Sequence, residues 1–201
     1  MCTKYGIQDG DFYNFDETGF MMGMICPSMV VTRSDRCGKG KAVQPSNREW
    51  ATVITCISGD GFDIPPFLLV QGQYHLANWY TEGGLPNSWV IKPTAKGWTN
   101  NDMSLNWIKY FEKHTRMRTK GGYRMLVLDG HESHISVDFE NFCKEHNIIP
   151  ICLPPHSSHL TQPLDVGFFG PLKKVYGKEI GKFIQAHINH ITKVEFFLAF
   201  Y

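Results

Sequence analysis

This sequence of 201 residues has no excess of charge of either sign, because 20 Lys and Arg residues stand against 19 Asp and Glu residues. The net charge of +1 excludes a polybasic tail and an acidic solvating chain, and bulk charge alone does not favour nucleic acid as a partner. Low-complexity segments are lacking as well. With 42% hydrophobic and 13% aromatic residues, the chain has the material for a core. It is therefore expected to fold as a globular domain.

The six cysteines form no C-x-x-C pair, the usual signature of zinc fingers and zinc ribbons. The chain is long enough to fold without disulfides and shows no signal peptide, which favours reduced intracellular thiols. Its longest apolar stretch, residues 20–31, contains Gly, Pro and Ser and is too short to cross a bilayer. The sequence therefore predicts no membrane partner.

The predicted elements follow one another as in a mixed α/β fold. β-Branched and apolar runs predict strands, residues 58–61 predict a hairpin turn, and helical spacing of apolar residues predicts helices. Strands are expected at residues 12–16, 50–57, 65–70, 123–128 and 148–153. Helices are expected to begin at Thr99, Ser136 and Asp165, whereas residues 71–97 predict no regular element.

Three aspartates occupy places where a fold of this class carries its chemistry. Asp16 is predicted to end the first strand, Asp129 to end the fourth, and Asp165 to open the last helix. Converging carboxylates repel one another unless cations are present. Mg²⁺ or Mn²⁺ suits such oxygen ligands, and two ions can activate a nucleophile and stabilise the leaving oxygen of a phosphoryl transfer. Glu17 is expected to have a structural role, because neighbouring strand residues face opposite sides of the sheet.

Three motifs surround these aspartates: NFDETGF at residues 14–20, LDGHESH at residues 128–134 and LPPHSSHLTQPLD at residues 153–165. They resemble the catalytic blocks of DDE-superfamily endonucleases, most closely those of pogo/Tigger-type transposases and the related centromere-protein-B-like proteins. Shorter motifs resemble intervening blocks of that family: NREW at 47–50, GWT at 97–99 and PLKK at 171–174. The resemblance covers residues 10–201, and the third block is its most specific part.

The resemblance implies an α/β, ribonuclease-H-like fold, a mixed sheet flanked by helices, with a site for two Mg²⁺ or Mn²⁺ ions. It implies cleavage and transfer of DNA strands, with Asp16, Asp129 and Asp165 as the catalytic acids and metal ligands. DNA is then the expected partner, with full-length transposase as a homo-oligomer, and the nucleus is the expected compartment. Family members carry helix-turn-helix domains ahead of the first catalytic strand. Residues 1–201 are therefore expected to be a catalytic domain truncated at both ends.

Four histidines accompany the second and third motifs: His131, His134, His156 and His159. A zinc site is one interpretation, but this spacing suits ligands on a helix, and these histidines lie in Gly- and Pro-containing segments that predict loops. The favoured interpretation is that they hydrogen-bond neighbouring carboxylates or backbone groups and so fix the loops. His134 or His159 is also a candidate for contact with the scissile phosphate.

Basic residues from two segments are candidates for contact with the DNA backbone. They are Lys173, Lys174 and Lys178 of the last predicted helix, and Arg33 and Arg36 of a polar predicted loop. A solvated helix face is the alternative interpretation of the lysines.

Two functions of different classes remain open. The first is a metal-dependent DNA endonuclease and strand transferase, which the presence of all three acids favours. The second is a domesticated or degenerate derivative that keeps the fold and contacts DNA or protein without turnover. The absence of recognition domains from the sequence favours this second function.

Overall fold

The computed structural model describes residues 2–24, 48–129, 136–154, 157–188 and 190–201, and the statements below concern these residues. The strands are β1 (Phe12–Met24), β2 (Arg48–Ser58), β3 (Asp63–Gln71), β4 (Val90–Thr94), β5 (Arg124–Leu128), β6 (Ile148–Cys152) and β7 (His190–Ile191). They form one mixed sheet in the order β4-β3-β2-β1-β5-β6, and β7 pairs with the far end of β1. β1, β2 and β3 are antiparallel neighbours, whereas β4, β5 and β6 join in parallel.

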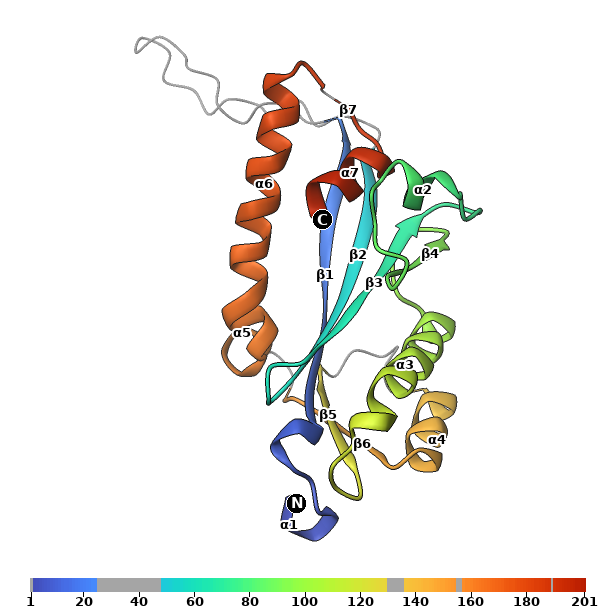
Figure 1. Ribbon diagram of the computed structural model, residues 1–201, viewed down its shortest axis with the longest axis vertical. Coiled ribbons are helices and arrows are strands. Elements are labelled where there is room, and N and C mark those ends of the chain that lie inside the picture. Colours follow the sequence, from blue (N-terminus) through green and yellow to red (C-terminus); the bar gives the residue numbers. More distant parts are fainter. Residues whose placement is uncertain (1, 25–47, 130–135, 155–156, 189) are drawn as a thin grey trace.

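Helices cover both faces of this sheet (Figure 1). The longer helices are α3 (Asn101–Thr115), α4 (Val137–Glu145), α6 (Phe169–Gln185) and α7 (Lys193–Phe200). The short ones are α1 (Cys2–Tyr5), α2 (Asn78–Thr81) and α5 (Ser158–Thr161), with 3₁₀ turns at Asp9–Asp11 and Arg116–Arg118. A π-helix, η4 (Leu164–Phe168), runs directly into α6. α3 and α4 pack on one face of the sheet, and α6 and α7 pack on the other.

Alternate residues of β1 belong to two hydrophobic clusters on opposite sides of the sheet. Tyr13 and Phe15 pack in the cluster under α3 and α4, whereas Phe20 and Met22 pack in the cluster under α6 and α7. Side chains alternate between the two faces of a strand. The even-numbered residues of β1, Asp16 among them, therefore face the α6 side.

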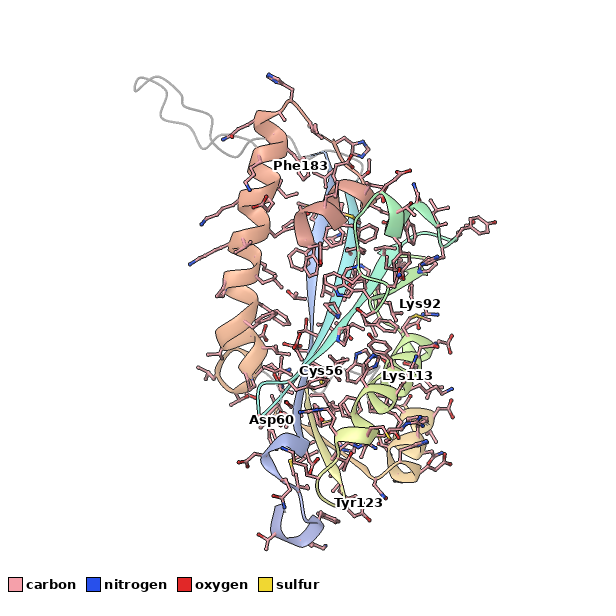
Figure 2. The ribbon with its side chains drawn as sticks, viewed as in Figure 1. Cys56, Asp60, Lys92, Lys113, Tyr123 and Phe183 are labelled. Carbon is pink, nitrogen blue, oxygen red and sulfur yellow. The ribbon has the colours of Figure 1, made fainter. Side chains whose placement is uncertain are left out.

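The two clusters fill the space between the sheet and its helices (Figure 2). Cys56 of β2 belongs to the cluster under α3, and Phe183, near the end of α6, packs against the other cluster. Burial raises the pKa of the Cys56 thiol well above its usual value, which makes it a poor nucleophile. Cys143 and Cys152 also carry free thiols.

β1 is longer than predicted, so the prediction that Asp16 ends the strand is wrong: Asp16 lies within it. The strand pairs with β2 from Tyr13 to Gly23. Gly19 lies within the strand and is covered by the ring of Trp50, whose atoms lie 3.5 Å from where a Cβ would stand. Pairing with β2 and the cover of this ring allow the strand to continue through the glycine.

Residues 71–97 contain two regular elements, α2 and β4, where the sequence predicted none. β4 pairs in parallel with β3 at the edge of the sheet and buries Ile91. Pro93 lacks an N–H, which an edge strand tolerates. The sequence predicted no regular element here because residues 71–97 are aromatic and glycine-rich.

Two helix starts also differ from the prediction. Asn100, not Thr99, caps α3, because its side-chain oxygen accepts a hydrogen bond from the N–H of Met103 at 2.9 Å. α7 was not predicted and begins with a reciprocal capping box between Thr192 and Glu195. The helix that begins in the third motif is therefore not the last.

The other predicted elements are confirmed. β2 and β3 form a hairpin around residues 58–61, and β5 pairs in parallel with β6; β5 is buried throughout, whereas β6 is a partly exposed edge strand. Ser136 caps α4 by accepting a hydrogen bond from the N–H of Phe139 at 3.3 Å. The fold is the expected mixed sheet flanked by helices.

Candidate active site

Asp16 and Asp129 stand at the same level of two neighbouring parallel strands. β1 and β5 pair with Asn14 opposite Val127, and two further residues along each chain lead to Asp16 and Asp129. Asp129 follows directly on the last residue of β5. Strand pairing thus brings together the acids of the first two motifs.

The Asp16 carboxylate is buried and only partly hydrogen-bonded. Its residue is 7% exposed, and its Oδ1 atom accepts a hydrogen bond from the N–H of Glu17 at 2.8 Å. Its Oδ2 atom is buried and has no hydrogen-bond partner among the described residues. An unpartnered buried carboxylate oxygen is costly, so this atom is positioned to receive a cation or a proton.

The charges of the other two aspartates act on this carboxylate. The pKa of Asp16 is raised from 3.8 to about 7, chiefly by burial; the charges of Asp165 and Asp129 contribute to the rise, whereas the N–H of Glu17 and the Gln162 amide oppose it. The charges of Asp129 and Asp165 therefore reach the carboxylate of Asp16. The site is therefore one that a cation would stabilise.

Asp165 reaches the site on the π-helix η4. Its side chain is exposed, whereas the preceding Leu164 is fully buried and anchors the turn. The N–H of Leu164 donates a hydrogen bond to the side-chain oxygen of Asn14 on β1, at 3.2 Å. π-Helical turns are rare and often occur at functional sites.

Gln162 forms a second link between the third motif and β1. Its amide nitrogen donates a hydrogen bond to the backbone oxygen of Phe15 at 2.8 Å, and its amide oxygen accepts one from Asn14 Nδ2 at 3.1 Å. Asn14 Nδ2 also approaches the backbone oxygen of Val127 on β5, at 3.4 Å. These two amides, Asn14 and Gln162, are called the amide bracket below.

A pocket lies along β2, the strand that pairs with the Asp16 strand. It measures about 330 Å³ and opens between the sheet and α6, and Thr55, the β2 partner of Asp16, forms part of its wall. Most of its other lining residues are apolar, among them Trp89, Phe168 and Leu172. Asp63 also lines the pocket, whereas Asp16, Asp129 and Asp165 are not among its lining residues.

The predicted site residues have different outcomes. Asp129 and Asp165 are near enough to Asp16 for their charges to raise its pKa, but no three Asp, Glu, His or Cys side chains in the described part of the chain lie close enough to hold one ion. Their role as metal ligands stays a prediction. Glu17 faces the α3 side, as expected, and accepts a hydrogen bond from the Thr99 hydroxyl.

Several predicted residues lie outside what the structure describes. They are His131, His134, His156, Arg33 and Arg36, together with the side chain of His159, whose backbone begins α5 next to Ser158. Lys173, Lys174 and Lys178 are described and are exposed on α6. These lysines come after Asp165 along the chain, on the helix α6 that continues from η4.

The sequence analysis missed the amide bracket. Asn14 and Gln162 both stand inside the quoted motifs, two and three residues from a predicted acid. A polar amide that alternates with the acid on a strand, as Asn14 does with Asp16, is a signal for a buried polar contact. Its partner 148 residues away leaves no such signal.

Residues 47–201 match the family of DDE superfamily endonucleases. The chain belongs to this family. Relatives support the pogo type: the human "Pogo transposable element with ZNF domain" is 26% identical over 139 residues, 68% of this chain and 9% of that protein. The human "Pogo transposable element with KRAB domain" is 25% identical over 161 residues, 79% of this chain and 25% of that protein.

A third relative, "MFS-type transporter clz9" of Cochliobolus lunatus, is 50% identical over 198 residues, 98% of this chain and 21% of that protein. The chain thus spans a quarter or less of these three relatives. Within the described residues, helices long and apolar enough to traverse a bilayer are absent.

Solved structures of transposases share the fold. A Mos1 transposase paired-end complex with left transposon end matches with a TM-score of 0.55 at 12% identity, over 96% of this chain and 52% of that chain. A Mos1 mariner paired-end complex with Mn matches with a TM-score of 0.56 at 11% identity, over 94% of this chain and 51% of that chain. The expected ribonuclease-H-like fold is confirmed.

Proposed function

We propose that this domain carries out metal-dependent cleavage and transfer of DNA strands, with Asp16, Asp129 and Asp165 as its catalytic carboxylates. The observation that carries the proposal is the state of Asp16: a buried carboxylate with an unpartnered oxygen and two further acids acting on it. Such an arrangement is unfavourable in an apo protein, and a bound cation relieves it.

These residues fit Mg²⁺ or Mn²⁺. Both ions prefer carboxylate oxygens, and the unpartnered Oδ2 of Asp16 offers one from a rigid strand. Asp129 and the exposed Asp165 would supply further oxygens from their two elements. When bound, a pair of such ions supplies Lewis-acid activation of the nucleophile and stabilisation of the leaving oxygen.

The chain's own part in the reaction is to fix the carboxylates. The N–H of Glu17 holds one oxygen of Asp16 and leaves the other directed into the site. Strand pairing fixes the level of Asp129 relative to Asp16. Positioned groups of this kind reduce the entropy lost in reaching the transition state.

DNA is the proposed substrate and partner. The exposed lysines of α6 follow Asp165 along one helix, where they are suited to contact phosphates next to the cleavage site. One solved structure with this fold is a transposase complex with a transposon end, and another is a paired-end complex with Mn. By the same reasoning we propose the nucleus as the compartment and assembly with further transposase chains.

One observation favours the second candidate, a derivative that binds DNA or protein without turnover. No three potential ligands of the described residues are close enough to hold one ion. If the acids do not close around metal, the fold and the lysines of α6 remain as a binding module.

Nicking of supercoiled plasmid at low salt, with Mn²⁺ or Mg²⁺ or with chelator, separates the two candidates. Metal-dependent nicking is expected from the unaltered chain and its loss from Asp16→Ala and Asp165→Ala. Asp102→Ala is the matched control, because Asp102 is exposed on α3, on the other face of the sheet. Nicking that survives both active-site substitutions would refute the assignment, and DNA binding without nicking would favour the binding module.

A further inference from the structure

We infer that Asn14 and Gln162, the amide bracket, are positioning residues that set the geometry of the three acids and hence the affinity of the site for divalent cations. This inference rests on the proposed function. The bracket touches each of the three elements that carry an acid: β1 with Asp16, β5 with Asp129 and η4 with Asp165.

The two amides are buried and their hydrogen-bonding groups are used on both sides. Gln162 is 0% exposed and Asn14 is 4% exposed. Each amide oxygen accepts one hydrogen bond and each amide nitrogen donates at least one. A buried network with every group satisfied holds one arrangement in preference to others. Rotation of either amide would leave a buried group without a partner.

The bracket also begins the helix that carries Asp165. Pro163 has no N–H, so Leu164 is the first residue of η4 with an N–H to satisfy, and Asn14 accepts its hydrogen bond. A residue of β1 therefore caps a helix that lies 150 residues later in the chain. The position of Asp165 relative to Asp16 depends on this contact.

The positions of Asn14 and Gln162 call for side chains that are neutral and that can also form hydrogen bonds. Asn14 and Asp16 face the same side of β1, so a carboxylate at position 14 would add a further negative charge to the site. An apolar pair would fill the space but leave the N–H of Leu164 and the carbonyl of Phe15 without partners. Amides satisfy the backbone groups without changing the charge that a cation meets.

The test measures Mn²⁺ affinity by calorimetry on the whole chain, with Gln162→Met and Asn14→Leu as variants of matched size without hydrogen bonds. We expect each to weaken Mn²⁺ binding by about tenfold or more, as loss of groups that orient metal ligands does. Thr52→Val is the matched control: it removes another buried side-chain hydrogen bond, Thr52 Oγ1 to the Gly97 carbonyl at 2.7 Å, on the α3 side. Its Mn²⁺ affinity should equal that of the unaltered chain.

Two further measurements separate positioning from general stability. Amide hydrogen exchange in chelator should accelerate at Leu164 and through η4 in both bracket variants, with β2 and β3 unchanged. The exchanged pair Asn14→Gln with Gln162→Asn keeps both amides and should recover part of the lost affinity. If Gln162→Met and Asn14→Leu bind Mn²⁺ as tightly as the unaltered chain while Asp16→Asn does not, the positioning role is overturned and the proposed function stands. If the unaltered chain shows no Asp16-dependent Mn²⁺ binding, both fail.

Discussion

The Glu17 carboxylate accepts a hydrogen bond from the Thr99 hydroxyl on the face of β1 opposite to Asp16. Two adjacent acids on one strand therefore have separate environments. Asp16 lies on the α6 side of the sheet, where the charges of Asp129 and Asp165 act on it, whereas Glu17 ties β1 to the segment that begins α3.

This separation predicts different effects of two matched substitutions. Glu17→Gln keeps an acceptor for Thr99 and should leave Mn²⁺ affinity unchanged within about twofold, at a stability cost of about 1 kcal/mol. Asp16→Asn should abolish measurable binding. Calorimetric titration of both variants checks this, and a loss of binding in Glu17→Gln as deep as in Asp16→Asn would show that Glu17 belongs to the metal site.

Divalent metal should raise the melting temperature of the unaltered chain. Ions that bind only the folded state stabilise it by about 2.7 kcal/mol at a hundredfold excess over Kd. For a chain of this length that corresponds to a rise of roughly 5–10 °C. Asp129→Asn keeps the shape but removes a charge, so its melting temperature should rise much less. Equal rises in the two proteins would place the ions elsewhere, and Asp102→Asn serves as the control of unchanged response.

Without metal, Asp16 should make stability fall as the pH rises. Its folded pKa of about 7 lies above the value of 3.8 for the ordinary carboxyl, so between these values the folded state holds a proton that the unfolded chain has lost. The contribution of Asp16 to the free energy of unfolding is therefore highest below pH 4, declines between pH 4 and pH 7, and is constant above pH 7. The full difference is on the order of 4 kcal/mol, at about 1.4 kcal/mol per pH unit.

Asp16→Asn removes this dependence and should be more stable than the unaltered chain at pH 8 in chelator, with little difference at pH 4. Melting temperatures measured across this range in chelator are the check. A variant that melts lower than the unaltered chain at every pH would show that the Asp16 carboxylate is not destabilised in the metal-free fold.

The lysines of α6 should control DNA affinity without affecting metal binding. Replacement of Lys173, Lys174 and Lys178 by Gln should weaken binding to duplex DNA and reduce the slope of log affinity against log salt by about 2–3, because each phosphate contact contributes about 0.9. Fluorescence anisotropy at several salt concentrations measures both quantities.

The control for these lysines is a triple Gln variant of Lys92, Lys109 and Lys113, all exposed and carried by β4 and α3. Figure 2 shows Lys92 and Lys113 on the side of the molecule away from α6. This variant should keep the salt slope of the unaltered chain. If both triple variants lose the same amount of DNA affinity and salt slope, the net charge of the chain determines binding and the α6 surface does not.

Local patterns predicted much of this fold, since hydrophobic runs and turn residues marked β2, β3, β5 and β6 correctly. The motifs also placed Asp16 and Asp129 at the ends of two predicted strands, but they did not predict that β1 and β5 are neighbours. The full length of β1 was not predicted, because the strand continues through Gly19 in pairing with β2, whose residue Trp50 covers the glycine. The contact of Asn14 with Gln162 was missed for a similar reason: its geometry exists only after the sheet has formed.

The contributions of β1 to both hydrophobic clusters have a consequence for folding fidelity. A slip of one residue against β2 would turn Tyr13 and Phe15 toward α6, and Phe20 and Met22 toward α3. Such a slip exchanges the contents of two cores at once, so misregistered chains lose packing on both sides of the sheet. The same slip would carry Asp16 to the wrong face. The apolar side chains on either side of Asp16 along β1 thus fix the strand register, and this register keeps the Asp16 carboxylate on the α6 face.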